Sequence, residues 1–332
     1  MRPSQVAQTL KSLIEINRPV HIEGSPGLGK TQVAQQVTRE LGIGIVQMHV
    51  PTLQPEDIAL PAVTADRTKM EFLVSKRFPV VGDENTPERG VIVFDELPQG
   101  DNSIQKTLAN VIQEREIHGH PLKSGWAIVT TGNKQSDRAG ANRILSHLRN
   151  RMTTIQFEPH LDDWCGWALD NGVKPEVVSF LRFKSALLCD FNPQNEINPT
   201  PRAWAEGVST IIDVVPKDVE FDCIAGAVGE GAAAEFYGFL KIARKLPNPD
   251  LILLNPSTHD VPTDPATLYA LAGAMAHRAS PDNFDRVLTY VKRMAPEFMV
   301  LTVRDAARID PKVVQTRAFT EWAAKEGSKV LM

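Results

Sequence analysis

The sequence predicts an α/β protein with a mostly parallel five-stranded sheet, followed by a region built from helices. In the first half of the chain, short β-rich runs alternate with helical patterns, which favours parallel strands covered by helices on both faces. After Phe157 the strand signals fade and helical patterns dominate. The five expected strands are Val20–Glu23, Ile45–Val50, Val91–Phe94, Ala127–Thr131 and Thr153–Phe157.

Two helical patterns lie between these strands. In Thr31–Leu41 the apolar residues fall on one helix face, and Gly42 follows as the expected C-terminal stop. Ser103–Gln113 has its apolar residues, Leu108 among them, at helical spacing. Both helices are therefore expected to pack one face against the sheet.

The length of 332 residues is too great for one ordinary core and indicates two or three domains. We expect an α/β domain over residues 1–158, a small helical unit over 159–215 and a helical extension over 216–332. The helices expected in the second region are Asp162–Asp170, Pro175–Phe183 and Pro201–Val214. Those expected in the third are Cys223–Leu246, Pro265–His277, Asn283–Met294 and Val313–Lys325.

The composition is that of an ordinary globular protein, with 42% hydrophobic and 23% charged residues. A net charge of −4 argues against a basic, nucleic-acid-binding surface that extends over the whole chain. The three cysteines are widely spaced, which favours a reducing compartment over a disulfide framework. Met1–Ile16 has an amphipathic pattern unlike a signal peptide, and the sequence lacks an apolar run of membrane-spanning length. We therefore expect a cytoplasmic protein without a membrane partner.

A glycine-rich segment, Gly24–Thr31, fits the phosphate-binding pattern G-x-x-x-x-G-K-[ST] in full. It follows an apolar strand and opens a helix, which is the context that this P-loop motif requires. Its glycines let backbone N–H groups converge on phosphate oxygens, while Lys30 reaches the β- and γ-phosphates and the Thr31 hydroxyl ligates Mg²⁺. The expected nucleotide-binding residues are Gly24, Ser25, Pro26, Gly27, Leu28, Gly29, Lys30, Thr31 and Gln32. We expect ATP, although a loop that reads phosphates leaves GTP open.

The apolar run Val91–Phe94 ends in two acidic residues, Asp95 and Glu96. An open parallel sheet binds its ligand at the carboxyl ends of its strands, so Asp95 is expected to hold Mg²⁺ together with Thr31. The adjacent Glu96 is expected to polarise the attacking water as general base. A strand ending in a solvated acidic turn is the alternative, and the P-loop beside it favours the metal site.

Asn133 follows the next apolar strand and is expected to position the water or to contact the γ-phosphate. The alternative is an asparagine in a tight turn, where this residue is common.

Two arginines complete the expected catalytic set. Arg202 lies in the first turn of a helix capped by Thr200, where a bound phosphate would offset the unfavourable macrodipole. Arg151 precedes the last strand and can project into a neighbouring subunit as an arginine finger, with Arg149 as a competing candidate. Solvated surface arginines are the alternative for all three.

In their order along the chain, these motifs resemble the AAA+ superfamily of P-loop NTPases, and most closely its MoxR-like branch. Gly24–Thr31 resembles Walker A, Val91–Glu96 resembles Walker B, and Asn133 resembles sensor 1. Arg151 matches the arginine finger and Arg202 matches sensor 2.

The resemblance implies an AAA+ ATPase with an α-helical lid, which forms a ring, usually a hexamer, with ATP at the subunit interfaces. Hydrolysis would remodel or assemble a protein partner in a chaperone-like way. Members of the MoxR branch often work with a von Willebrand factor A domain protein, so that client is an expectation from resemblance.

Two hairpins are expected at Ala62–Pro79 and Arg115–Gly125, and in a ring they could contact the substrate. Two rival functions stay open. One is a DNA-directed AAA+ motor or loader, with a basic track on these hairpins formed by Lys69, Lys76, Arg77 and Lys123. The other is an ATP-gated scaffold without useful turnover, against which Glu96 and the two arginines argue.

Overall fold

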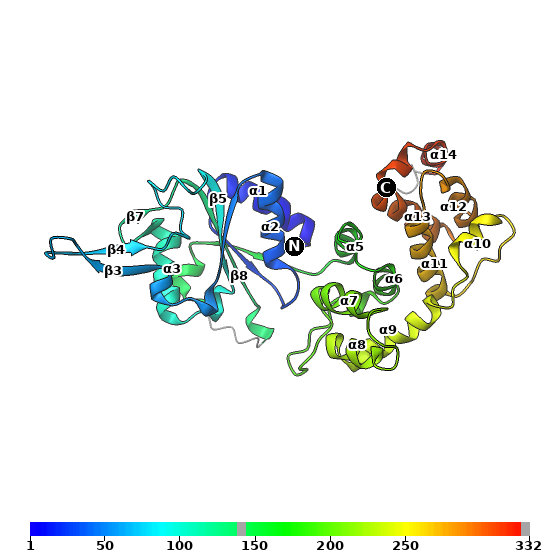
Figure 1. The fold of residues 1–332 in the computed structure, drawn as a ribbon, viewed down its shortest axis with the longest axis horizontal. Coiled ribbons are helices and arrows are strands. Elements are labelled where there is room, and N and C mark those ends of the chain that lie inside the picture. Colours follow the sequence, from blue (N-terminus) through cyan, green and yellow to red (C-terminus); the bar gives the residue numbers. More distant parts are fainter. Residues whose placement is uncertain (138–143, 327–332) are drawn as a thin grey trace. The chain divides into compact units, whose positions relative to one another are not determined.

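A computed structural model describes residues 1–137 and 144–326 of the chain (Figure 1). The chain divides into two compact units. Met1–Pro159 together with Phe191–Gln194 form the sheet unit. His160–Asp190 and the described chain from Asn195 onward form the helical unit.

The sheet unit is built on five parallel strands in the order β2-β5-β8-β1-β9, counted within the described residues. Each of the five expected strands is present, which confirms the predicted fold class. Because β1 lies between β8 and β9, the chain crosses over the sheet rather than adding strands in sequence order. The strands are β1 Val20–Glu23, β2 Gly44–His49, β5 Arg89–Asp95, β8 Gly125–Gly132 and β9 Thr153–Gln156.

Helices lie on both faces of this sheet (Figure 1). Helices α1 (Pro3–Glu15) and α2 (Lys30–Leu41) pack together on one side, and α3 (Asn102–Glu114) lies on the other. The buried strand residues Ile92 and Phe94 belong to the same core as α3. Helix α2 is followed by Gly42, whose φ of 62° makes the left-handed cap that the sequence predicted. A short helix, α4 (Ser146–Arg149), precedes β9.

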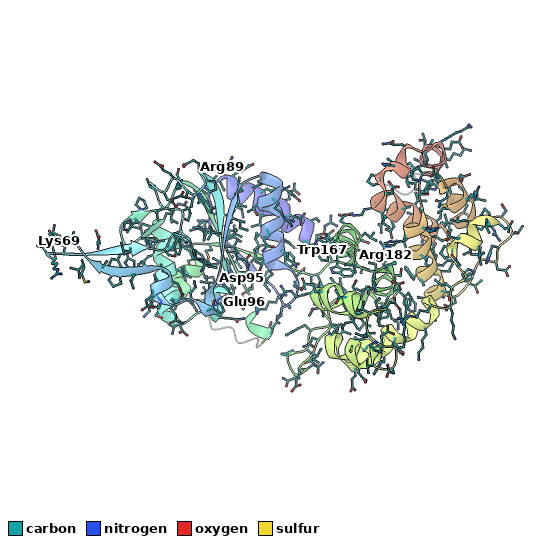
Figure 2. The ribbon with its side chains drawn as sticks, viewed as in Figure 1. Lys69, Arg89, Asp95, Glu96, Trp167 and Arg182 are labelled. Atoms are coloured by element: carbon teal, nitrogen blue, oxygen red, sulfur yellow. The ribbon has the colours of Figure 1, made fainter. Side chains whose placement is uncertain are left out.

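Two antiparallel hairpins are inserted between the sheet strands, as expected. The longer one pairs β3 (Ala59–Val63) with β4 (Met70–Val74) and projects away from the sheet, with Lys69 at its tip (Figures 1 and 2). The shorter one pairs β6 (Glu116–Ile117) with β7 (His120–Pro121). The rings of Phe72 and His118 stack with centroids 3.9 Å apart, which joins the two hairpins.

The helical unit contains two hydrophobic cores. One unites helices on both sides of residue 216 and includes Trp204 and Phe236, while the other includes Leu271 and Tyr290. Residues Ala203–Val208 form a π-helical segment that leads into α7. The α-helices are α5 Leu161–Asp170, α6 Pro175–Phe183, α7 Ser209–Ile211, α8 Glu220–Val228, α9 Glu230–Ala243, α10 Pro249–Leu254, α11 Pro265–Arg278, α12 Phe284–Val291, α13 Pro296–Ile309 and α14 Arg317–Lys325.

Several details of this unit differ from the sequence-based expectation. The single helix expected over Cys223–Leu246 is broken at Gly229, whose φ of 84° lies outside the helical region. Helices α10 and α13 were not expected, although each begins with a proline, which is common at the first helical position. The helix expected over Val313–Lys325 is divided at Thr316 into a 3-10 helix, Pro311–Gln315, and α14. Among the described residues, none of the helices is long and apolar enough to cross a membrane.

Two of the ion pairs that join helix α13 to its neighbours differ in burial. Arg182 on α6 and Asp305 on α13 form a bidentate pair whose side chains are 6% and 4% exposed. Arg308 on α13 pairs with Asp170 on α5, and these side chains are 47% and 48% exposed. The inner pair excludes water, whereas the outer pair is solvated.

We therefore predict that Asp305→Asn destabilises the helical unit by about 3 kcal/mol or more, because it leaves the Arg182 charge buried without a counter-charge. Asp170→Asn is the matched control and should cost about 1 kcal/mol or less. Urea unfolding followed by tryptophan fluorescence measures both changes. Equal losses in the two variants would contradict this assignment.

Candidate functional site

The loop Gly24–Gly29 connects β1 to the first turn of α2. Gly27 and Gly29 have φ values of 72° and 88°, a left-handed conformation that side-chain-bearing residues rarely adopt. At Gly24 an added Cβ would lie 2.7 Å from the carbonyl oxygen of Phe157, so a larger residue would force the backbone to shift. These glycines shape the loop so that its N–H groups and the N-terminus of α2 can receive phosphate oxygens.

Lys30 begins α2, and its side chain turns back along the inside of this loop. Its Nζ donates at 2.9 Å to each of three oxygens: the carbonyls of Gly24 and Ser25 and the side-chain Oδ1 of Asn133. Lys30 is 8% exposed and Asn133 is 7% exposed. The ammonium group is thus held against the P-loop by the residue expected at sensor 1, which follows β8.

The second motif lies at the end of β5, where Asp95 and Glu96 leave the sheet side by side; Arg89 marks the opposite end of the strand (Figure 2). Asp95 Oδ1 accepts hydrogen bonds from Thr31 Oγ1 at 2.5 Å and Thr131 Oγ1 at 2.6 Å. The structure therefore brings Walker A and Walker B residues into direct contact.

Glu96 leaves the strand through a left-handed backbone conformation with φ 57° and ψ 41°. This conformation is uncommon for a residue other than glycine, and such residues cluster at functional sites. The Glu96 N–H donates to Thr131 Oγ1 at 3.0 Å. The Glu96 carboxylate is one-third exposed, so water reaches it.

The expected arginines lie in three different environments. Arg149 is about half exposed and pairs at 3.3 Å with Glu23, the last residue of β1. Arg151 is partly buried, and its Nη1 finds no hydrogen-bond partner in the described part of the chain. Arg202 belongs to the helical unit, where its side chain is 54% exposed and lies 3.8 Å from Glu206. The sheet unit therefore gathers Lys30, Thr31, Asp95, Glu96 and Asn133, while Arg202 belongs to the other unit.

Comparison with known proteins finds a family model that matches part of the chain. Residues 19–152, less than half of the chain, match the AAA domain of the dynein-related subfamily. The sheet unit has the AAA+ P-loop NTPase fold. The matched segment begins before β1 and ends before β9, so it contains Walker A, Walker B and Asn133.

Solved structures resemble the chain only distantly. NtrX from Brucella abortus in complex with ADP is 14% identical, with a TM-score of 0.40 over 98% of this chain and 67% of that one. A candidate ATPase from Cytophaga hutchinsonii is 16% identical, with a TM-score of 0.36 over 92% of this chain and 80% of that one. Comparison with curated proteins gives no match.

The residues at the P-loop of the AAA+ fold suit Mg²⁺. Magnesium prefers oxygen ligands, keeps several of its waters and is usually held by one or two protein groups together with substrate phosphates. The Thr31 hydroxyl and the Asp95 carboxylate supply such oxygens in contact with one another. The described residues contain no group of three or more His, Cys, Asp or Glu side chains that could hold a metal without a phosphate.

Sequence reasoning missed two residues of this site, Thr131 and His49. Thr131 was assigned only as the end of a strand, yet its hydroxyl contacts both acidic residues of Walker B. His49 is the last residue of β2, and its two ring nitrogens lie 3.9 Å from Asp95 Oδ2 and from Glu96 Oε2. Both could have been found by treating every polar residue at the carboxyl end of a parallel strand as a candidate.

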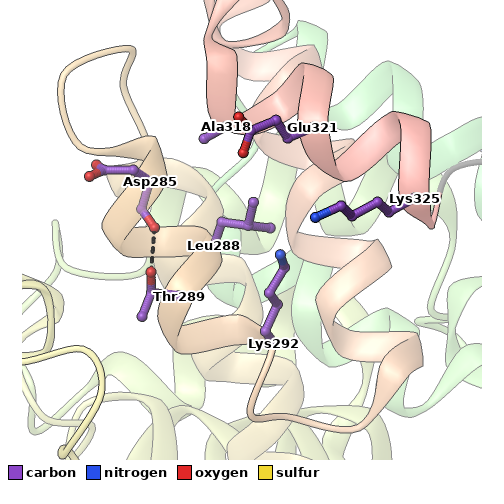
Figure 3. A pocket seen from close by; sticks show the side chains of 7 residues that line it. All are labelled: Asp285, Leu288, Thr289, Lys292, Ala318, Glu321 and Lys325. Carbon is purple, nitrogen blue, oxygen red and sulfur yellow. Dashed lines mark hydrogen bonds between the residues drawn. The ribbon is translucent and has the colours of Figure 1, made fainter.

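A separate pocket of about 190 Å³ lies between α12 and α14 of the helical unit. Figure 3 shows Lys292 and Lys325 reaching toward each other beside Leu288, with Glu321 above them. Nearby, the Thr289 hydroxyl donates to the backbone oxygen of Asp285 at 2.8 Å. Pockets for drug-sized ligands usually exceed about 300 Å³. This pocket is therefore too small for a nucleotide and contains none of the AAA+ motif residues.

His21 lies within β1, the strand that leads into the P-loop, and is fully buried. Its Nδ1 is 2.7 Å from Thr130 Oγ1. Burial, followed by the charges of Arg149 and Lys30, lowers the pKa of His21 to about 3. The unfolded chain binds this proton near the ordinary histidine pKa of about 6.5, so folding stability falls as the pH drops from that value toward 3.

We predict that the sheet unit loses about 2 kcal/mol of stability through His21 between pH 7 and pH 5. Urea unfolding at the two pH values measures the loss. The His21→Leu variant should lack this part of the pH dependence, because leucine does not titrate. The same pH dependence in both proteins would show that His21 is not held neutral.

Proposed function

We propose that this chain is an ATPase of the MoxR-like branch of the AAA+ superfamily, which hydrolyses ATP with Mg²⁺ and uses the energy to remodel or assemble a protein partner. The observation that carries the proposal is the convergence of Lys30, Thr31, Asp95, Glu96 and Asn133 at one edge of the sheet. Each of these side chains has a separate task in phosphoryl transfer.

The proposed binding step uses the P-loop. Its backbone N–H groups and the N-terminus of α2 receive the β- and γ-phosphates, and Lys30 adds a positive charge beside them. Thr31 and Asp95 are the proposed ligands of Mg²⁺, which when bound neutralises phosphate charge. Because Lys30 donates to Asn133, both residues stand at the proposed γ-phosphate position.

The proposed chemical step is an in-line displacement by water. The Glu96 carboxylate accepts a proton as the water oxygen bonds to the γ-phosphorus. The bond from that phosphorus to the β–γ bridging oxygen breaks, which leaves ADP and phosphate. Asn133 orients the water. The exposure of the Glu96 carboxylate is consistent with this task.

We further propose that the active form is a homo-oligomeric ring, most simply a hexamer, with the nucleotide at subunit interfaces. An arginine finger from the neighbouring subunit completes such a site, and Arg151 is our first candidate. Arg149 is the second, because it is half exposed beside the end of β1. Arg202 is the proposed sensor 2 residue, since its exposed guanidinium can exchange Glu206 for a phosphate.

The proposed partner is a protein client, and a von Willebrand factor A domain protein is the leading class by resemblance to the MoxR branch.

One observation that favoured the rival DNA-directed motor is weakened by the structure. Lys123, expected on its basic track, is 6% exposed and bonds to Glu88 at 2.8 Å. We also propose a cytoplasmic setting, because the cysteines at 165, 189 and 223 form no disulfide, which suits a reducing compartment.

Steady-state ATPase activity measured against protein concentration tests this function. We expect activity to rise cooperatively with concentration and GTP to be a poorer substrate than ATP. Glu96→Gln should lower kcat by about 10² or more while ATP still binds, because it removes the general base. Arg151→Ala should lower kcat by about 10³ or more if the finger acts in trans.

Arg149→Ala is the matched control for the finger, and a loss confined to that variant would transfer the role to Arg149. Activity independent of concentration and unaffected by either change would overturn the shared-site ring. Wild-type protein that binds ATP without turnover would favour the scaffold. The Glu96→Gln variant loaded with ATP should retain a protein client in a pull-down, whereas retention of DNA alone would favour the DNA-directed motor.

A further inference from the structure

Thr131 lies near the end of β8, between the two acidic residues of Walker B. Its side chain is fully buried. The Thr131 hydroxyl donates to Asp95 Oδ1 at 2.6 Å and accepts from the backbone N–H of Glu96 at 3.0 Å. The Thr131 hydroxyl thus contacts both the side chain of Asp95 and the backbone of Glu96.

The first of these contacts fixes the Asp95 carboxylate. Asp95 Oδ1 receives hydroxyl hydrogens from both Thr31 and Thr131. A hydroxyl that ligates a metal through its oxygen can still donate its hydrogen, so Thr31 can keep this contact when Mg²⁺ binds. Two donors on one carboxylate oxygen restrict rotation of the group, because hydrogen bonds to a charged acceptor are stronger than neutral ones.

The second contact fixes the turn at Glu96. A left-handed backbone is unfavourable for glutamate and persists only where the surroundings hold it. The Glu96 N–H is held by Thr131, and the Glu96 carbonyl oxygen accepts from the N–H of Gln99 at 2.9 Å. This turn directs the glutamate away from the path of β5. The position of the general base therefore depends on a side chain from the neighbouring strand.

We propose that Thr131 is a positioning residue that locks the Asp95 carboxylate and the Glu96 turn together, so that Mg²⁺ binding and the placement of the general base are coupled through β8. This inference rests on the proposed ATPase function. Strand β8 leads two residues later to Asn133, which accepts from Lys30. The same strand end therefore contacts both the Walker A and the Walker B residues.

The adjacent residue offers a matched control. Thr130 is also fully buried, but its hydroxyl bonds to Val20 O and to His21 instead of Walker B. Valine has nearly the shape of threonine and suits a strand, so Thr131→Val and Thr130→Val each remove one hydroxyl at little change in volume. Thr131→Ser keeps the hydroxyl and removes only a methyl group.

The experiment measures kcat, KM for ATP and the Mg²⁺ concentration for half-maximal activity in the three variants and the wild type. It adds titration of fluorescent ADP with and without Mg²⁺, and thermal unfolding. For Thr131→Val we expect kcat to fall by about 10- to 100-fold, the value of a lost hydrogen bond to a charged group. Its Mg²⁺ requirement should rise, and the Mg²⁺-dependent gain in ADP affinity should shrink. ADP affinity without Mg²⁺ should stay within about twofold of the wild type, because the P-loop itself is unchanged.

Thr131→Ser should recover kcat and the Mg²⁺ requirement to within about threefold of the wild type, because the hydroxyl makes both contacts. Thr130→Val should unfold at a lower temperature with kcat and the Mg²⁺ requirement unchanged. If the wild type hydrolyses ATP and Thr131→Val has the same kcat and Mg²⁺ dependence, the inference about Thr131 is overturned and the proposed function stands. Loss of ADP affinity without Mg²⁺ in both valine variants would also overturn it, since the effect would then be general to the strand. A wild type that binds no nucleotide would overturn the proposed function and this inference together.

Discussion

The parallel alignment of β5, β8 and β1 is the constraint on which the rest of the site depends. Neighbouring parallel strands end at the same edge, so residues far apart in the sequence meet there. Thr31 contacts Asp95 across 64 positions of the chain, and Lys30 contacts Asn133 across 103. The site is therefore a property of the sheet and not of any single loop.

This arrangement concentrates unfavourable features at one edge. The ammonium group of Lys30 is buried, two P-loop glycines and Glu96 have left-handed backbones, and the Asp95 carboxylate is taken largely out of water. Each feature is stabilised locally, by carbonyl oxygens, by hydroxyl donors or by the strands themselves. Strained and buried polar groups of this kind cluster at functional sites, where the strain helps to hold side chains ready for a ligand. Their presence here is consistent with a nucleotide pocket that is organised before the nucleotide binds.

Much of the sheet unit could be predicted from the sequence, because its signals are local. Apolar runs such as Val91–Phe94 predicted the strands, and the spacing of Gly24–Thr31 predicted the P-loop, its helix and the left-handed cap at Gly42. The contacts of Thr131 and His49 could not be predicted in the same way. They depend on strand order, which sequence patterns do not reveal, and both residues looked like ordinary members of strands.

The helical unit was predicted less well for related reasons. A run of small and apolar residues concealed the break at Gly229, because glycine occurs both within helices and at their ends. Helix α13 is secured by the buried pair between Arg182 and Asp305, a contact that joins residues 123 positions apart. The roles of Arg151 and Arg202 stay predictions, since they concern a neighbouring subunit and a bound phosphate.

The measurement that tests the central claim most directly is calorimetric titration of ATP into the wild type and into Lys30→Met, in buffer containing Mg²⁺. If the edge of the sheet is a nucleotide site, the wild type should bind about one ATP per chain, and loss of the Lys30 charge should weaken binding by about tenfold or more. Equal affinity in the two proteins, or no binding to either, would contradict the account.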